Sequence, residues 1–433
     1  MENLQATIND LDMFGLGISH RDDKVIFIDN SLPGEIVEYE KTKTKKNLVF
    51  AKNLKIIKKC ENRVTPLCPY FNECGGCDIQ HLKYLESLNF KKEQIKTTFK
   101  KIANINLEDF EIIKSDNEYF YRNKIALQIN KNKKLCMHKK NSNDLIEIES
   151  CKLISPKFDY VIKCVNAYLN HINLTPYDKT KEEGDLKHLV VKIINDNLLL
   201  TFVLKRNSEL EDINFLYNNL KQKFKNVGIN KNINKFDHEI LSQNFINLIG
   251  LNTINYSSFN IIQKINNASF LQVNEGVATK LYNYVLQNVK KNIVNAYSGA
   301  GLLSGILSKN LKSKVYGIEI NPNSHKLANI LKQENNLTNL ENFCGDARKI
   351  LKQLNLKNFT LILDPPRSGL DKNMIDEIIQ NLPDKIIYIS CNKITMAKNL
   401  KELLRFYDLG EIKAFDMFPQ TVNCEVAAIL EKK

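Results

Sequence analysis

From about residue 270 to the end of the chain, strand-like and helix-like segments alternate, and this pattern constrains the fold more than any other feature. Short apolar runs such as 293–297 and 385–390 are separated by stretches with helical spacing. Alternation of this kind builds a mostly parallel sheet with helices on both faces, and ligands bind at the carboxyl ends of its strands. We therefore predict a doubly wound, Rossmann-like α/β domain over residues 263–433.

The first part of the chain has a different texture. In residues 1–60, glycines and prolines punctuate short strands, which predicts a small β barrel of the oligonucleotide-binding type. Residues 61–262 begin with clustered cysteines and continue with strands such as Lys124–Ile129, so we predict a β-rich central domain. Residues 81–103 have the apolar spacing of a helix, which could pack on the catalytic domain.

The charge balance favours a polyanionic partner. Lys and Arg number 62 against 49 Asp and Glu, a net charge of +13, and nucleic acid is the first candidate. Eight lysines and one acid lie between Tyr39 and Lys59, where they form either a solvated face or a surface that tracks phosphates. A genome rich in A and T would raise the lysine content as well, so charge alone does not decide.

Other composition signals exclude several classes of protein. No run of eighteen apolar residues occurs, so we expect no membrane span. The N-terminus carries acids where a signal peptide needs a basic start and an apolar core, which predicts a cytoplasmic protein. No coiled-coil heptads stand out, so we expect a monomer.

Three cysteines lie within ten residues in the stretch CPYFNECGGC. Cys68, Cys74 and Cys77 have C-x5-C-x2-C spacing, and Cys151 could supply a fourth thiolate. Thiolates bind both zinc and iron–sulfur clusters. A compact triad with one distant cysteine is more typical of iron–sulfur proteins, so we predict a [4Fe–4S] cluster, with zinc as the first alternative and coincidental buried thiols as the second.

A nucleotide site is indicated where three successive strands end. In NAYSGAG, Gly299 and Gly301 would let the backbone approach a ligand closely. Glu319 ends the next strand, where a carboxylate binds ribose hydroxyls, and Asp346 follows a third strand, where it suits an adenine amine. An NAD-dependent dehydrogenase would share these features.

The residues at the ends of the fourth and fifth predicted strands distinguish a dehydrogenase from other nucleotide-binding enzymes. LILDPPRSGL places Asp364 and two rigid prolines after a strand, which is a feature of methyltransferases that act on a planar nitrogenous base. IIYISCNK places Cys391 at the end of the next strand. This cysteine is either a small residue that closes the core or a nucleophile at the reactive edge.

The ordered segments CPYFNECGGCDIQHL, SFLQVN, NAYSGAG, LILDPPRSGL, YISCNK and FDMFPQTVNCE resemble the RNA 5-methyluridine methyltransferases. The branch is the iron–sulfur type that acts on 23S ribosomal RNA, and the N-terminal barrel resembles the TRAM domain of that branch. The resemblance implies transfer of a methyl group from S-adenosylmethionine to C5 of a uridine, through a covalent bond between a cysteine and C6.

The resemblance also assigns roles to individual residues. It implies Cys391 as nucleophile and Glu425 as base, with Phe270 and Asp364 against the target uracil. The implied contacts to S-adenosylmethionine are Gln272, Tyr297, Gly299, Gly301, Glu319, Asp346 and Asp364, and the implied cluster ligands are Cys68, Cys74, Cys77 and Cys151. The chain departs from the family pattern at Asn295, where aspartate is usual, and at Cys424, where histidine is common.

Two other functions remain open at the level of the sequence. The first is the same reaction on transfer RNA, which the residues around Cys391 do not separate from the reaction on ribosomal RNA. The second is a non-catalytic RNA-binding factor that keeps the fold. Intact Cys391, Glu425, Gln272 and Asp364 argue against the second, because a binding module needs none of them together.

Overall fold

The computed structural model of the chain describes residues 4–290 and 292–433. Its internal contacts divide it into two compact units. The first unit comprises Met1–Ile95, Met137–Ile146 and Phe418–Asn423. The second comprises Lys96–Cys136, Glu147–Met417 and Cys424–Lys433. The division into three domains, at residues 60 and 262, stays a prediction.

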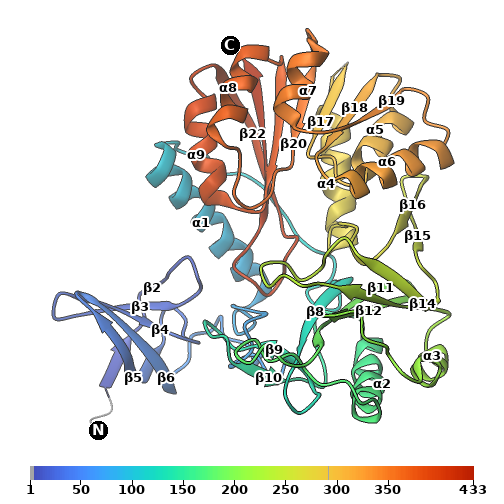
Figure 1. Cartoon of the computed structure of the whole chain (residues 1–433). Helices are drawn as coiled ribbons and strands as arrows, with labels where there is room; N and C mark the ends of the chain where they lie inside the picture. Colours follow the sequence, from blue (N-terminus) through green and yellow to red (C-terminus); the bar gives the residue numbers. More distant parts are fainter. Residues whose placement is uncertain (1–3, 291) are drawn as a thin grey trace. The chain divides into compact units, whose positions relative to one another are not determined.

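The first unit contains a six-stranded sheet with the order β1-β5-β6-β4-β3-β2 (Figure 1). The long hairpin of β5 and β6 carries most of its exposed lysines, and Ile28, Val37 and Tyr39 lie in its core. The strands are β1 Leu4–Thr7, β2 Asp10–Leu11, β3 Gly17–Arg21, β4 Lys24–Ile28, β5 Ile36–Lys45 and β6 Leu48–Lys58. The barrel and its TRAM assignment stay predictions.

The predicted helix at 81–103 is present as α1, Tyr84–Ala103. Ile95 and Phe99 are buried, as the apolar spacing requires. Beyond it the chain forms a seven-stranded sheet with the order β10-β9-β8-β11-β12-β13-β14. Its elements are β8 Lys124–Ile129, β9 Leu135–His138, β10 Leu145–Glu147, β11 Leu186–Ile194, β12 Asn197–Leu204, β13 Asn226–Ile233 and β14 Phe245–Gly250, with helices α2 Lys157–His171 and α3 Ile213–Lys221.

The predicted α/β domain is an eight-stranded sheet with the order β19-β18-β17-β20-β21-β23-β22-β7. Strands β17 to β21 are parallel, whereas β23 runs antiparallel between β21 and β22. The strands are β7 Ile112–Ile113, β17 Ile293–Ala296, β18 Val315–Glu319, β19 Leu340–Cys344, β20 Thr360–Leu363, β21 Lys385–Ser390, β22 Tyr407–Phe415 and β23 Glu425–Lys432.

Six helices accompany this sheet in two contacting groups, α4–α5–α6 and α7–α8–α9 (Figure 1). A hairpin of β15 Ile254–Ser258 and β16 Ile261–Ile265 contacts α5 and α6. The helices are α4 Glu275–Asn288, α5 Leu302–Asn310, α6 Pro322–Glu334, α7 Ala347–Leu354, α8 Lys372–Asn381 and α9 Lys393–Leu403. Five of them begin directly after a residue whose side chain caps the helix; these caps are Asn274, Asn321, Asp346, Asp371 and Asn392.

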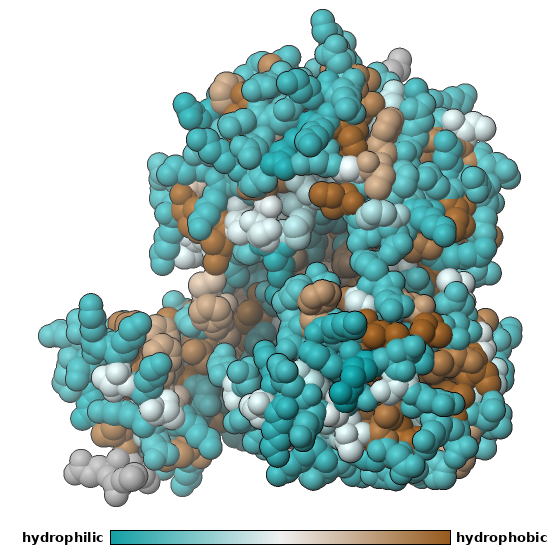
Figure 2. Space-filling model, viewed as in Figure 1, coloured by the Kyte–Doolittle hydropathy of each residue, from teal (hydrophilic) through white to brown (hydrophobic). Residues whose placement is uncertain are grey.

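The surface is mostly polar. Hydrophilic side chains cover most of the face that Figure 2 presents, with smaller hydrophobic patches between them. In the described parts of the chain, 4–290 and 292–433, no helix has the length and apolar character needed to cross a membrane.

Candidate active site

The predicted reactive residues meet at the carboxyl edge of the eight-stranded sheet. Asp364 directly follows β20 and Cys391 directly follows β21. Glu425 is the first residue of β23, which pairs with β21 so that Ser390 lies opposite Val426. Because the pairing is antiparallel, Glu425 comes beside Cys391 although 33 residues separate them in the chain.

Burial disfavours the charged forms of Asp364, Glu425 and Cys391, so it raises the pKa of all three groups. Burial raises the pKa of Asp364 to about 7. Burial, and then the Asp364 carboxyl, raise the pKa of Glu425 well above its usual value, and Glu425 is only 3% exposed. Burial, followed by the Glu425 carboxylate, also raises the pKa of the Cys391 thiol. The three groups therefore act on one another electrostatically.

Two residues of this group were not predicted. The charge of Arg367 and its side-chain hydrogen bond oppose the rise in the pKa of Cys391, and its charge also opposes that of Glu425. Tyr282, on α4, is buried, and its pKa is raised by burial and then by Asp364. Arg367 could have been found from its place three residues after Asp364 in the DPPR turn, whereas Tyr282 has the signal of an ordinary core aromatic.

The turn that carries Arg367 is tied to the helix after Cys391. The Arg367 carbonyl accepts hydrogen bonds from the Asn392 side-chain amide at 2.9 Å and from the Thr395 hydroxyl at 3.3 Å. Asn392 also caps α9. The residue after the predicted nucleophile therefore fixes both the helix start and the arginine turn.

On the other half of the edge, the glycine turn and Glu319 form one hydrogen-bonded unit. The Glu319 carboxylate accepts from the backbone N–H of Gly299 at 2.8 Å and of Asn321 at 2.7 Å. Gly301 has φ +83°, and a Cβ there would lie 2.8 Å from the Cβ of Ala328, so glycine is required by both conformation and space. Gly299 has φ +57° and open space around it, as an approach to a ligand needs.

A cavity of ≈ 160 Å³ lies beside this turn, between the ends of β17, β18 and β19. Tyr297 and Asp346 both line it, together with Arg348 and Asp371. Asp346 caps α7 and accepts from the Arg348 Nε at 2.9 Å and 3.0 Å, which lowers the pKa of its carboxyl. Burial, and then Asp371 and Asp346, raise the pKa of Tyr297 to about 12. The carboxylate predicted for an adenine amine is thus paired with Arg348.

Gln272 and Phe270 lie together on the loop between β16 and α4. Gln272 is 5% exposed, and its carbonyl accepts from the Asn123 side-chain amide at 3.0 Å. Phe270 is 66% exposed. At this exposure, Phe270 does not pack in the core.

Comparisons with known proteins give this site its family. Residues 83–433 match the family described as tRNA (Uracil-5-)-methyltransferase. An uncharacterized RNA methyltransferase of Staphylococcus epidermidis is 31% identical, with 98% of this chain and 96% of that protein covered. Another, of Clostridium acetobutylicum, is 30% identical over the same shares. The chain belongs to the RNA (uracil-5-)-methyltransferase family.

A solved structure agrees with this assignment. The Pyrococcus abyssi tRNA (uracil-54, C5)-methyltransferase, in complex with S-adenosyl-L-homocysteine, has a TM-score of 0.81 and 25% identity, covering 99% of this chain and 100% of that one. The protein described here is therefore an S-adenosylmethionine-dependent RNA methyltransferase, and the dehydrogenase alternative is excluded.

The two departures from the family pattern have structural roles. The buried Asn295 side-chain amide donates to the Ser304 hydroxyl at 2.9 Å, joining β17 to α5. The Cys424 thiol donates to the Phe415 carbonyl at 3.1 Å. Both residues therefore secure strands that end at the site.

The predicted cluster ligands are not gathered into a metal site. Across residues 4–290 and 292–433, no three His, Cys, Asp or Glu side chains are grouped closely enough to hold a metal ion. Cys68, Cys74 and Cys77 belong to the first unit and Cys151 to the second. The Gly76 N–H donates to the Cys74 sulfur at 3.4 Å, a bond of the kind that tunes cluster thiolates.

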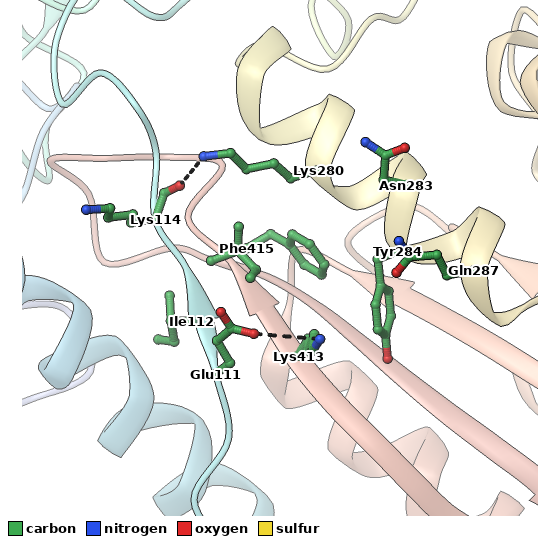
Figure 3. Close-up of a pocket in the computed structure, with 10 residues that line it drawn as sticks. Glu111, Ile112, Lys114, Lys280, Asn283, Tyr284, Gln287, Lys413 and Phe415 are labelled. Carbon is green, nitrogen blue, oxygen red and sulfur yellow. Dashed lines mark hydrogen bonds and ion pairs between the residues drawn. The ribbon is translucent and has the colours of Figure 1, made fainter. Parts of the chain in front are cut away.

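A larger cavity of ≈ 540 Å³ lies elsewhere in the second unit, between β7, β22 and α4. Figure 3 shows Lys280 bonded to the Lys114 carbonyl and Lys413 paired with Glu111. None of the predicted site residues lines it. Lys280 is also 2.6 Å from Asp116, so Lys280 and Lys413 are each paired with an acidic side chain.

Proposed function

We propose that this enzyme methylates C5 of a uridine in 23S ribosomal RNA through a covalent bond between Cys391 and C6 of the base. The observation that carries the proposal is the position of Cys391 beside Glu425 at the carboxyl edge of the sheet. A nucleophile and a proton acceptor at one edge suit a reaction that must first activate C5 and then remove its proton.

The steps follow from the chemistry of the base. The Cys391 thiolate adds to C6, and the C5–C6 π electrons move toward C5 and the O4 carbonyl. S-adenosylmethionine supplies the methyl group that C5 takes. The Glu425 carboxylate then accepts the C5 proton, the C5–C6 double bond re-forms, and the C6–S bond breaks to release the thiolate.

The electrostatics favour this division of roles. Arg367 stabilises the thiolate form of Cys391, which burial otherwise disfavours. Glu425 has a raised pKa, so its carboxylate is a stronger base than an exposed glutamate. Asp364, with a pKa near 7, suits a hydrogen bond to the uracil edge in either protonation state.

We assign substrate and cofactor contacts on the same basis. A stacked uridine hides C6, so the base must be flipped out, and the exposed Phe270 offers it a ring to stack on. Gln272, Tyr297, Gly299, Gly301, Glu319 and Asp346 would hold S-adenosylmethionine. The open space at Gly299 and the cavity at Tyr297 support this placement.

The preference for ribosomal RNA rests on the resemblance of the N-terminal region to a TRAM domain, although a transfer-RNA enzyme of Pyrococcus abyssi matches 99% of this chain in structure. The eight lysines at 41–59 are all exposed, and Leu54 and Ile57 are exposed among them, which suits a surface that tracks an RNA backbone. We expect a monomeric enzyme that acts in the cytoplasm.

We also propose that the segment 68–77, with Cys151, binds a [4Fe–4S] cluster. The thiol spacing and the N–H bond to the Cys74 sulfur support this. Anaerobically purified protein should contain iron and acid-labile sulfide, and Cys74→Ser should lose both. Zinc without sulfide would show that the cysteines bind zinc instead of an iron–sulfur cluster. Anaerobically purified protein that contains no metal would contradict the proposal.

The main test uses RNA that contains 5-fluorouridine, as a 23S fragment and as transfer RNA, with S-adenosylmethionine present. Fluorine cannot leave C5 as a proton, so the Cys391 adduct should stall and appear as a shifted band on a denaturing gel. A band with the 23S fragment that Cys391→Ala abolishes would support both chemistry and substrate. A band only with transfer RNA would transfer the proposal to that substrate, and no band with either would favour a non-catalytic RNA-binding factor.

A further inference from the structure

Two lysines lie opposite each other where β8 pairs with β11. Lys124 faces Lys192 in the antiparallel register, and Lys192 is 1% exposed. Burial, and then Lys124, hold the pKa of Lys192 well below its usual value, while burial and Arg122 lower the pKa of Lys124 to about 8. No carboxylate among the described residues contributes to either pKa. Lys192 is buried and Lys124 is half-buried. Two adjacent amino groups with so little solvent are costly to charge, so the groups that they contact need an explanation.

Their partners are three backbone carbonyls of a single turn. Lys192 Nζ donates to the carbonyls of Asn266 at 2.6 Å and Ser269 at 3.0 Å. Lys124 Nζ donates to the carbonyl of Asn267 at 2.9 Å. Within the turn, the Ser269 N–H and hydroxyl both donate to the Asn266 side-chain oxygen at 2.8 Å. The carbonyls therefore converge on the sheet while the turn closes on itself.

Two further hydrogen bonds join the same loop to neighbouring residues of the sheet. The Asn267 side-chain amide donates to the Thr201 hydroxyl of β12 at 2.6 Å. Asn123, which precedes Lys124, binds the carbonyl of Gln272 through its side chain. Phe270 projects between these attachment points and is 66% exposed. A large exposed aromatic is thus carried on a turn anchored on both sides.

We propose that Lys192 and Lys124 are positioning residues that hold the turn 266–269, and through it the placement of Phe270 and Gln272. Both lysines donate hydrogen bonds to backbone carbonyls, so they fix the path of the loop independently of the contacts that its side chains make. The ligands involved, a flipped pyrimidine on Phe270 and S-adenosylmethionine at Gln272, rest on the proposed function. The mechanical role of the lysines does not.

The test compares Lys192→Met with Lys187→Met. Lys187 lies on the same strand, is 7% exposed, and donates to the Phe236 carbonyl at 2.6 Å and to Asp237 at 2.9 Å, so it anchors a loop without predicted site residues. In Lys192→Met, we expect amide hydrogen exchange at 267–273 to rise by about tenfold or more, since charge-assisted hydrogen bonds are lost. The affinity for S-adenosylhomocysteine, measured by calorimetry, should fall by about tenfold.

Lys187→Met should leave both quantities within about twofold of the wild type at a similar loss of thermal stability. Lys192→Arg keeps the donors and should recover part of the affinity. Unchanged exchange at 267–273 in Lys192→Met, or an equal loss of affinity in Lys187→Met, would overturn the proposal. If Lys192→Met does not fold, Lys124→Met removes one bond and gives the same comparison. Amide hydrogen exchange is measured without RNA. A negative result in the fluorouridine test would therefore contradict the proposed function without affecting the test of the lysines.

Discussion

The two halves of the carboxyl edge differ in how their acidic groups are compensated. On the cofactor half, Glu319 accepts two backbone N–H groups and Asp346 has a lowered pKa because Arg348 pairs with it. On the reactive half, burial raises the pKa of both Asp364 and Glu425. A carboxylate that is paired with donors or with a cation keeps its charge and its position. A buried carboxyl group without such a partner has a raised pKa, which suits proton exchange or a hydrogen bond to a substrate.

The difference arises from the strands that surround each group. Glu425 starts β23, which is flanked on both sides by β21 and β22, so water is excluded from its carboxyl. Asp346 follows β19 at the outer edge of the sheet, where Arg348, in the first turn of α7, pairs with it. The paired Asp346 therefore follows an edge strand, and the buried Glu425 begins an interior strand of the same sheet.

The largest expected effect comes from removing the proton acceptor of the reactive half. Glu425→Gln should lower turnover by about 10²–10⁴-fold, because the C5 proton has no acceptor. RNA that contains no fluorouridine should then remain covalently bound, with its C5 methylated, on a denaturing gel. Glu431→Gln is the control, since Glu431 lies on the same strand but pairs with Lys385. Normal turnover in Glu425→Gln would remove this residue from the mechanism.

A second variant alters Arg367, whose charge and side-chain hydrogen bond oppose the rise in the pKa of Cys391. Without its guanidinium, Arg367→Met should raise the pKa of the thiol further. The rising limb of the activity–pH profile should move to higher pH, with a loss of about tenfold at pH 7 that recovers at alkaline pH. Arg367→Lys keeps the charge and should shift the profile less. An unshifted profile in Arg367→Met would contradict the role given to this arginine.

The stability of the protein should report the uncompensated charge of Asp364. Its pKa in the folded state is about 7, above the usual 3.8, so its contribution favours folding below pH 3.8 and is lost as the pH rises through 7. Asp364→Asn removes the ionisation, so it should raise the free energy of unfolding at pH 8 by about 1–4 kcal/mol and leave it nearly unchanged at pH 4. Urea unfolding at both pH values measures this. A loss of stability at pH 8 would show that Asp364 is compensated after all.

The smallest effect is expected on the cofactor half. Arg348→Met should return the pKa of Asp346 toward its usual value, and this partly exposed pair should cost less than about 1 kcal/mol of stability when broken. Turnover at saturating S-adenosylmethionine should change by less than about threefold. A tenfold loss of turnover would mean that the two halves are not separate in function.

Much of the catalytic domain was predictable because its signals are local. The strand before Cys391 and the helix at 81–103 were expected where β21 and α1 lie. Glycine, proline and capping residues mark the ends of such elements within a few positions. The sequence also placed Glu319 and Asp364 at strand ends, where the parallel sheet collects them at one edge.

The electrostatic character of the site was not predictable, because it depends on partners that are distant or structurally ambiguous. Arg348 at Asp346 and Tyr282 near Asp364 carry no pattern that distinguishes them from surface or core residues, and for Arg367 the DPPR turn gives its position but not its pairing with Cys391. The turn held by Lys124 and Lys192 is a similar case, since a lysine in a strand gives no sign that it will be buried against carbonyls. The cysteine spacing predicted a metal site that the described side chains do not assemble.

The sequence by itself determined the order of strands and helices and the residue that stands at each strand end, since periodicity, turn residues and caps act over a few positions. Only the tertiary structure decided which of these residues are compensated. The antiparallel insertion of β23 between β21 and β22 brings Glu425 beside Cys391 and buries the Glu425 side chain, whereas Cys391 is half-buried. Burial and charge pairing depend on the whole packed sheet, and they set the pKa of each group.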